Sequence, residues 1–275
     1  MKLKFLAAAL LSLATQAQAQ QPAATSGYAT IGPLKMYYEL HGNGKGQPLV
    51  LIHGGGSTIG TSFSKVIDAF AQHREVIAVE LQAHGHTADI DRPLSFKQDA
   101  DDVASLLTQL GIAQADFLGF SNGGQTAIEI ALRHPKLVRK LVLASTFYKR
   151  EGAYPWLWAG FPHASLNDMP KDLRDANLAI THDSASLKRM FNRDVERMKA
   201  FTNWPDEAIR SIQAPTLVMI GDEDVTKPEH AVEMYRTLPH ARLIILPGKH
   251  GEFLQGAGEL PLCTVAMVNE FLDVP

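Results

Sequence analysis

The chain has 275 residues, of which 45% are hydrophobic and 20% are charged, and its formal net charge is −3 at pH 7. A chain of this length and composition can bury a sizeable core. Because the net charge is negative and the sequence has no basic stripe, we expect no nucleic-acid partner.

The first residues have the three parts of a signal peptide. Met1 to Lys4 is positively charged, Phe5 to Ala14 is apolar but too short to span a membrane, and Ala17-Gln18-Ala19 has the small residues of a cleavage site. We therefore expect residues 1–19 to be removed and the mature protein to be exported, as a periplasmic or secreted product. No later segment of the sequence approaches the length of a membrane span.

The mature chain opens with an expected antiparallel pair of strands, residues 28–31 and 34–40. The apolar segment Pro48–Ile52 is the next predicted strand, and it leads into His53-Gly54-Gly55-Gly56. Consecutive glycines allow the backbone to approach a bound molecule closely and to direct an N–H group at a developing negative charge. Gly55 is our candidate for that donor.

A strand over residues 76–81 and a helix over residues 95–110 follow. Between them lies His84-Gly85-His86, the closest histidine spacing in the chain. Because no further ligands accompany these histidines in a recognisable pattern, we expect a turn here and no metal site.

The segment Phe117 to Gly124 is the most informative part of the chain. It runs an apolar strand into Gly119-Phe120-Ser121-Asn122-Gly123 and then into a helical pattern that ends before Pro135. Small residues on both sides of a serine are typical of a sharp strand-to-helix turn that exposes the hydroxyl at the end of a strand. Ser121 is therefore a candidate nucleophile, and the N–H of Asn122 is a candidate second donor to an oxyanion.

A strand over residues 137–144 is followed by a long stretch, residues 146–212, with helical and loop patterns and no clear strand. This stretch is a candidate cap. It holds all three tryptophans, Trp156, Trp158 and Trp204, with further aromatic residues and methionines. We expect most of these side chains to pack the cap and a few to line an apolar pocket over Ser121.

After the candidate cap, the alternation of strands and helices resumes. Two further apolar strands are predicted, residues 215–220 and 241–246. The first ends in Gly221-Asp222-Glu223-Asp224 and the second leads to His250. A serine hydroxyl needs an imidazole to accept its proton, and the imidazole needs a carboxylate to fix its tautomer. Both groups are present, in the chain order serine, acid, histidine. A last helix, residues 259–272, contains the single cysteine, Cys263, which we expect to be buried.

Together these motifs resemble the α/β-hydrolase superfamily over nearly the whole mature chain. The resemblance implies an α/β fold, with a mostly parallel, doubly wound sheet and an inserted helical cap. The core would comprise residues 20–145 and 213–275, and the cap residues 146–212. The resemblance also implies a catalytic triad of Ser121, Asp224 and His250, with Asp222 as the alternative acid. It implies that the oxyanion hole is formed by Gly55 and Asn122. Glu80 and Ala83 depart from the family pattern, where Asp and Gly are more common.

The same resemblance implies a serine hydrolase that cleaves a small-molecule carboxylic ester or lactone through an acyl-enzyme, without cofactor or metal. A macrolide-type lactone is the narrower expectation, because the turn after residue 80 and the motif around Ser121 look similar to those of exported bacterial esterases. Aminopeptidase, carbon–carbon bond hydrolase and perhydrolase activities use the same triad. A non-catalytic binding module of the same fold is a further alternative. A dehalogenase or epoxide hydrolase is disfavoured, because such relatives carry Asp at the position of Ser121.

Overall fold

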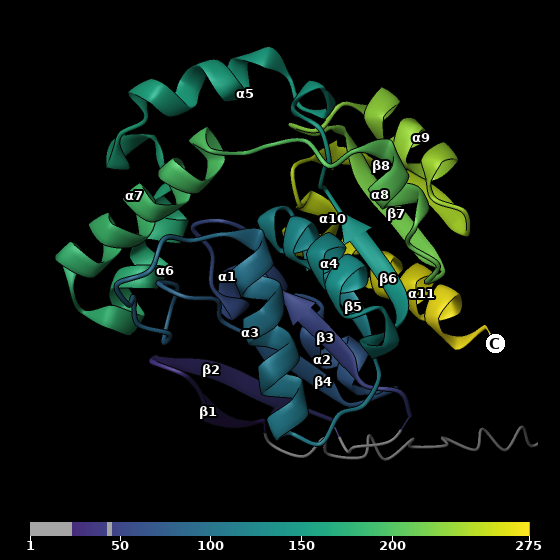
Figure 1. The fold of residues 1–275 in the computed structure, drawn as a ribbon, viewed down its shortest axis with the longest axis horizontal. Coiled ribbons are helices and arrows are strands. Elements are labelled where there is room, and N and C mark those ends of the chain that lie inside the picture. The colour runs from purple at the N-terminus through teal and green to yellow at the C-terminus, as the bar shows by residue number, and fades with distance from the viewer. Residues whose placement is uncertain (1–23, 43–45, 275) are drawn as a thin grey trace, which may run out of the picture.

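The computed structural model describes residues 24–42 and 46–274, so the predicted signal peptide, residues 1–19, lies outside the described residues. One eight-stranded sheet runs through the molecule in the order β1-β2-β4-β3-β5-β6-β7-β8 (Figure 1). The strands are β1 (Thr25–Ile31), β2 (Leu34–His41), β3 (Leu49–Ile52), β4 (Val76–Val79), β5 (Ala115–Phe120), β6 (Val138–Ala144), β7 (Thr216–Glu223) and β8 (Ala241–Lys249).

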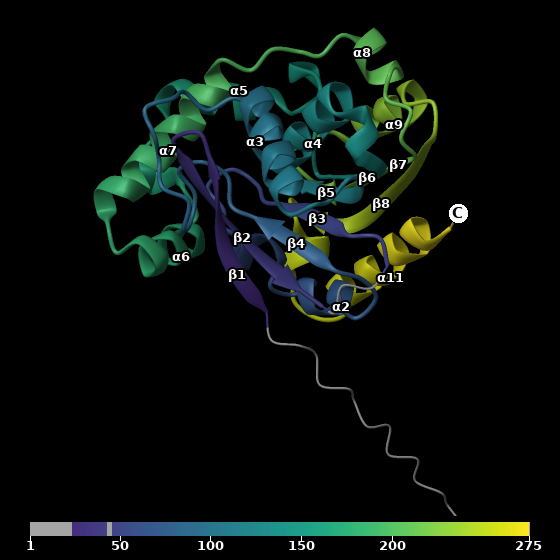
Figure 2. The ribbon, with the colours of Figure 1, turned by 60° about the horizontal axis from the view of Figure 1, so that its bottom comes forward.

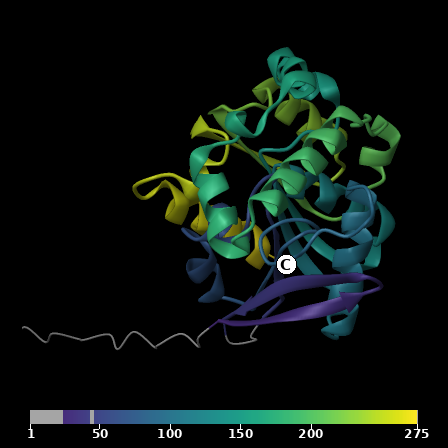
Figure 3. The ribbon, with the colours of Figure 1, turned by 90° about the vertical axis from the view of Figure 1, so that its left-hand side faces the viewer.

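The strand pairing is parallel from β4 to β8, and only the first two strands run against it. β1 pairs with β2 as an antiparallel hairpin, and β2 pairs antiparallel with β4. The hairpin forms one edge of the sheet, drawn in purple in Figure 3. The strands β3, β4 and β5 are buried along their whole length, which explains their unbroken apolar sequences. The predicted fold class is therefore confirmed.

Helices cover both faces of the sheet, as Figure 2 shows. One apolar core lies between the sheet and α3, α4 and α9, and a second lies between the sheet and α1, α2, α10 and α11. The covering helices are α1 (Ile59–Phe63), α2 (Ile67–Ala71), α3 (Phe96–Gln109), α4 (Asn122–Arg133), α9 (Pro228–Thr237), α10 (Glu252–Gln255) and α11 (Leu260–Asp273), with the 3₁₀ turn η1 (Pro135–Leu137). Cys263 on α11 is exposed, contrary to expectation, because the apolar side chains of that helix leave it on the outer face.

The stretch between β6 and β7, residues 146–212, contains helices and none of the eight strands of the described sheet; we call it the cap. Its helices are α5 (Pro155–Gly160), α6 (Lys171–Thr181), α7 (Ser184–Lys199) and α8 (Asp206–Arg210), with the 3₁₀ turns η2 (Arg150–Gly152), η3 (Phe161–His163) and η4 (Leu166–Asp168). Figure 1 shows α5, α6 and α7 beyond the sheet end at which β5 meets α4. Within the described residues, no helix has the length and apolar character needed to cross a bilayer.

Candidate active site

Ser121 lies at the turn between β5 and α4, with φ 53° and ψ −120°. These angles are strained for a residue with a side chain, and such strain is typical of a nucleophile elbow. The turn is held in place because the Ser121 N–H donates to the carbonyl of Ala144 at 2.8 Å. The serine is half-buried at the wall of a cavity.

The glycines beside Ser121 are required by close backbone contacts. A Cβ added to Gly119 would lie 2.2 Å from the carbonyl oxygen of Gly123, and one added to Gly123 would lie 2.1 Å from that of Ile52. Since backbone atoms cannot move aside at little cost, both positions exclude larger residues. The G-x-S-x-G pattern is thus explained by packing of the elbow against β3 and α4.

His250 and Asp224 are hydrogen-bonded to each other. His250 Nδ1 donates to Asp224 Oδ1 at 2.7 Å, and His250 Nε2 has no hydrogen-bond partner among the described residues. Burial alone would raise the pKa of Asp224, but the hydrogen bond and positive charge of His250, with hydrogen bonds from Ser145 and Thr226, outweigh it and lower that pKa. Asp224 therefore stays ionised at neutral pH and fixes the imidazole with Nε2 available as a base.

The alternative acid, Asp222, lies elsewhere. Its side chain is exposed and its Oδ1 accepts the N–H of Gly248 at 2.8 Å. The geometry thus brings His250 to Asp224 and leaves Asp222 as a brace between the ends of β7 and β8.

Two further residues support Asp224 and were not foreseen from the sequence. Ser145 Oγ donates to Asp224 Oδ2 at 2.5 Å, and the Thr226 N–H donates to Oδ1 at 3.1 Å. Ser145 directly follows β6, which lies between the strand of Ser121 and that of Asp224. The position of Ser145 at a strand end was therefore a signal that could have been used.

The glycine loop, Gly54-Gly55-Gly56, follows β3 and lies against Ser121: a Cβ on Gly54 would come within 3.2 Å of Ser121 Cβ. A Cβ on Gly55 would approach Asn122 Nδ2 to 2.4 Å, so the loop packs directly on the start of α4. Neither the Gly55 N–H nor the Asn122 N–H donates a hydrogen bond to another described residue. Two unpaired N–H groups beside Ser121 are what an oxyanion hole requires.

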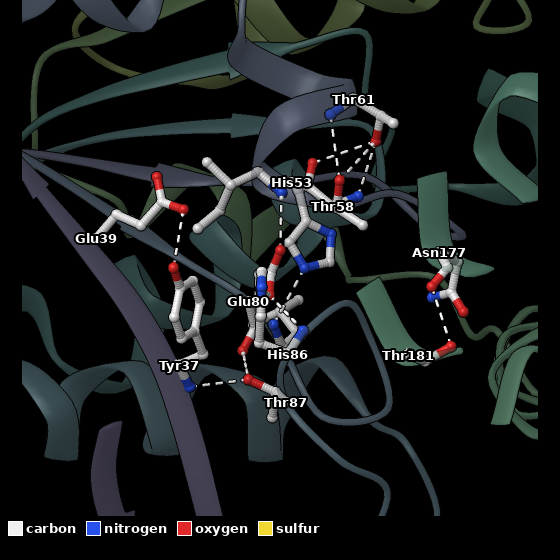
Figure 4. A network of polar contacts seen from close by, with 12 residues as sticks. Tyr37, Glu39, His53, Thr58, Thr61, Glu80, His86, Thr87, Asn177 and Thr181 are labelled. Atoms are coloured by element: carbon white, nitrogen blue, oxygen red, sulfur yellow. Dashed lines mark hydrogen bonds and ion pairs between the residues drawn. The ribbon is translucent and has the colours of Figure 1, made fainter. Parts of the chain in front are cut away.

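His53, before the glycines, is locked in one neutral form. Its Nδ1 donates to the Gly54 carbonyl at 2.7 Å and its Nε2 accepts the Leu81 N–H at 3.0 Å. Burial, helped by the positive charge of His84, lowers its pKa to about 3. Figure 4 shows His53 next to Glu80, whose carboxylate accepts from the backbone and ring of His86 at 2.6 and 2.9 Å. The residues after β4 thus serve as a polar support for the glycine loop.

The other side of the loop is held by the cap. Asp194, on α7, accepts the Gly56 N–H at 2.7 Å through Oδ2, which also lies 3.0 Å from His84 Nε2. Arg197 donates to Asp194 Oδ1 at 2.6 Å and to Asp99 Oδ2, on α3, at 2.8 Å. We call His84, Asp99, Asp194 and Arg197 the buried ion cluster. The sequence offered no signal for it, since charged residues are frequent throughout the cap.

The pKa values in the buried ion cluster follow from burial and mutual pairing. Burial opposes ionisation of His84 and of Asp194, but their attraction for each other outweighs it, so the pKa of His84 is raised and that of Asp194 is lowered. For Asp99 burial prevails over the charge of Arg197 and raises the pKa to about 6. The ring of His84 is thus paired with the carboxylate of Asp194, and the ring of His86 with that of Glu80. Within the described residues, no group of three or more potential ligands could hold a metal ion.

The triad and the glycine loop open onto one cavity of about 470 Å³ under the cap. The charged side chains lining it within the described residues are two carboxylates, Asp168 and Asp194, besides the titratable His250. The remainder of the wall is mainly apolar and includes Phe147, Trp156, Leu157, Phe161, Met169, Leu173, Phe191 and Met198. Of the three tryptophans, Trp156 lines the cavity, whereas Trp158 and Trp204 pack within the aromatic core of the cap.

Comparison with known proteins agrees with this geometry. The alpha/beta hydrolase fold family matches residues 47–257, and the chain therefore belongs to that family. It is a hydrolase of the alpha/beta hydrolase fold.

Three examples illustrate the range of proteins to which this chain is similar. The chain is 31% identical over 213 residues to a 2-hydroxymuconate semialdehyde hydrolase of Pseudomonas sp. (strain CF600), covering 69% of this chain and 74% of the relative. It is 30% identical to the dihydrolipoyllysine-residue acetyltransferase component of the acetoin cleaving system of Pseudomonas putida, covering 84% of this chain but 65% of that protein. The crystal structure of the enol-lactonase from Burkholderia xenovorans LB400 is similar in fold, with a TM-score of 0.73 and 23% identity over 90% of this chain and 100% of that one.

Proposed function

We propose that the protein is a serine esterase or lactonase that acts on neutral, largely apolar substrates. The observation that carries this proposal is the cavity: Ser121 and His250 open onto a wall that is mainly apolar and has no lysine or arginine among the described residues. Proteins that bind carboxylate substrates use cations or bidentate arginine to pair the negative charge. A neutral ester needs no such partner.

The residues support an acyl-enzyme mechanism. Ser121 Oγ attacks the carbonyl carbon while His250 Nε2 takes its proton, and Asp224 stabilises the resulting imidazolium. The oxyanion accepts hydrogen bonds from the N–H groups of Gly55 and Asn122. His250 then gives its proton to the leaving alcohol oxygen. In the second half, the same imidazole deprotonates a water molecule that releases the acid from Ser121.

The relative that is named for 2-hydroxymuconate semialdehyde raises carbon–carbon bond hydrolysis as a second candidate. The name of its substrate implies a carboxylate. In this chain a carboxylate in the cavity would meet no lysine or arginine among the described lining residues. A carboxylate that loses its hydration without gaining a cationic partner costs free energy, which favours the neutral ester over this alternative.

The test compares two matched substrates after active-site labelling. Fluorophosphonate should label Ser121, and a non-catalytic module would not be labelled. An aryl ester of a neutral acyl chain should then have a kcat/KM at least about 10-fold above that of the same ester with a terminal carboxylate. Preference for the carboxylated substrate, or cleavage of a vinylogous 1,5-diketone acid but not of esters, would overturn the assignment. A simple lactone, a macrolide lactone and a peptide amide complete the panel and separate the remaining alternatives.

A further inference from the structure

We propose that Asp194 of the cap is a positioning residue for the oxyanion hole: it holds the glycine loop through Gly56 so that the adjacent Gly55 N–H points at the reacting carbonyl. This inference rests on the proposed ester hydrolysis. It adds a function to the cap beyond covering the cavity.

The first step is the hydrogen bond itself. The Gly56 N–H and Asp194 Oδ2 are 2.7 Å apart, within the range of charge-assisted bonds. On the other side of Gly55, the Gly54 carbonyl is fixed by His53 Nδ1 at 2.7 Å. The peptide groups flanking Gly55 are therefore anchored, one by the core and one by the cap. An oxyanion donor is effective only when it is preorganised in this way.

The second step is the charge state of His84, which the geometry determines. Its Nδ1 lies 2.8 Å from the Gln82 carbonyl and its Nε2 lies 3.0 Å from Asp194 Oδ2. Neither oxygen can donate to the ring, so both ring nitrogens donate and His84 is an imidazolium. The Gly56 nitrogen also lies 3.3 Å from His84 Nε2. Because a protonated ring nitrogen cannot accept a hydrogen bond, this contact is not a hydrogen bond. Gly56 is held by Asp194.

The third step concerns electrostatics at the reacting centre. An uncompensated carboxylate on the cavity wall would disfavour an oxyanion nearby. Asp194 is compensated by His84 on one oxygen and by Arg197 on the other, and Asp99 balances Arg197. At neutral pH, above the raised pKa of Asp99, the buried ion cluster therefore has two positive and two negative groups. Asp194 can accept the loop N–H without imposing a net negative charge on the site.

Asp168 is a matched control for Asp194. It also lies in the cap and lines the same cavity, but its carboxylate accepts from Ser165 on its own 3₁₀ turn and is hydrogen-bonded to no part of the glycine loop. Asp168→Asn therefore removes a carboxylate that lines the same cavity and leaves the hydrogen bonds of the loop untouched.

The experiment compares Asp194→Asn, Asp194→Glu and Asp168→Asn with the wild type, using a neutral aryl ester and its thiono analogue, in which sulfur replaces the carbonyl oxygen. Asp194→Asn should lower kcat by about 10- to 100-fold, somewhat less than complete loss of one donor, with KM changed less than about threefold. Because sulfur accepts hydrogen bonds poorly, the wild-type preference for oxygen over sulfur should shrink in this variant. Asp168→Asn removes a lining charge without removing a hydrogen bond to the glycine loop, so it should leave the preference for oxygen over sulfur unchanged within about twofold.

Several outcomes would overturn the proposal. They are an unchanged kcat in folded Asp194→Asn, an equal loss for ester and thiono ester, and an equally shrunken preference for oxygen over sulfur in Asp168→Asn. If Asp194→Asn does not fold, Asp194→Glu decides, since it keeps both ion pairs but displaces the carboxylate, and it should show the same shrunken preference. Amide hydrogen exchange provides a readout without turnover: Gly56 should be protected in the wild type and exposed in Asp194→Asn. A wild type that is protected at Gly56 but hydrolyses no ester would refute the proposed function alone.

Discussion

The two sides of the candidate active site are supported by different parts of the chain. Ser121, Asp224 and His250 follow β5, β7 and β8, and Asp224 is braced by Ser145 after β6, so this side is built entirely from neighbouring strand ends. The glycine loop also follows a strand, but its Gly56 N–H is held by α7 of the cap. On our proposal, the sheet alone can assemble the candidate triad, whereas alignment of the proposed oxyanion hole depends on the cap.

The largest effect should come from removing the nucleophile. Ser121→Ala should reduce ester turnover by about 10⁵-fold or more, because the covalent route is lost while the residual binding groups remain. Thermal unfolding should stay close to that of the wild type, which a melting curve checks. Near-normal turnover by a folded Ser121→Ala protein would show that Ser121 is not the nucleophile.

The next effect distinguishes the two aspartates after β7. Asp224→Asn should lower kcat by about 10⁴-fold, since an amide favours the wrong imidazole tautomer. Asp222→Asn is the matched change at an exposed position. It should lower kcat less than about threefold, because the Asp222 carboxylate accepts a hydrogen bond from the Gly248 N–H and does not pair with His250. Steady-state kinetics of the pair measures both. The reverse ranking would move the acid to Asp222.

A smaller effect, on stability, should reveal the charge pairing on the cap side. Asp194→Asn leaves His84 without its buried carboxylate and Arg197 with Asp99 alone, which should lower the free energy of unfolding by about 3 kcal/mol near neutral pH. The pKa of Asp194 is lowered by folding, so its contribution is present above about pH 4, where unfolded aspartate titrates, and is lost as the pH falls. The pKa of His84 is raised, so its contribution is full below about pH 6.5 and is lost as the pH rises through the raised value.

The stability gap between wild type and Asp194→Asn should therefore be widest between roughly pH 4 and 6.5 and narrow on both sides. Urea unfolding from pH 3.5 to 9 measures it, with Asp168→Asn as the control that should show a far smaller gap. A gap independent of pH would contradict the assignment of His84 and Asp194 as an ion pair.

The smallest effect should come from the brace of the acid. Ser145→Ala removes one hydrogen bond to Asp224 while the Thr226 N–H remains, so kcat should fall by only about 10-fold. The loss should shrink in an Asp224→Asn background, which a double-mutant cycle tests. Full additivity would mean that Ser145 acts independently of the acid.

The sequence alone determined the fold and predicted the candidate site residues. Unbroken apolar strands such as Leu49–Ile52 indicate a parallel sheet, and residues after successive parallel strands must meet at one edge, so Ser121, Asp224 and His250 could be placed together without coordinates. The need for glycine at positions 119 and 123 could also be predicted from the sequence motif, and the structure explains it, because close backbone contacts leave no room for a side chain there.

Only the tertiary structure decided which groups hold these residues in place. Ser145 and Asp224 are 79 residues apart, and Gly56 and Asp194 are 138 residues apart. Nothing local distinguishes Asp194 or Arg197 from the other charged residues of the cap, since a charged side chain acquires its role from the partner that folding brings to it. Local periodicity and backbone sterics are encoded within a few residues, whereas charge pairing across a cap and a core depends on how separate layers pack.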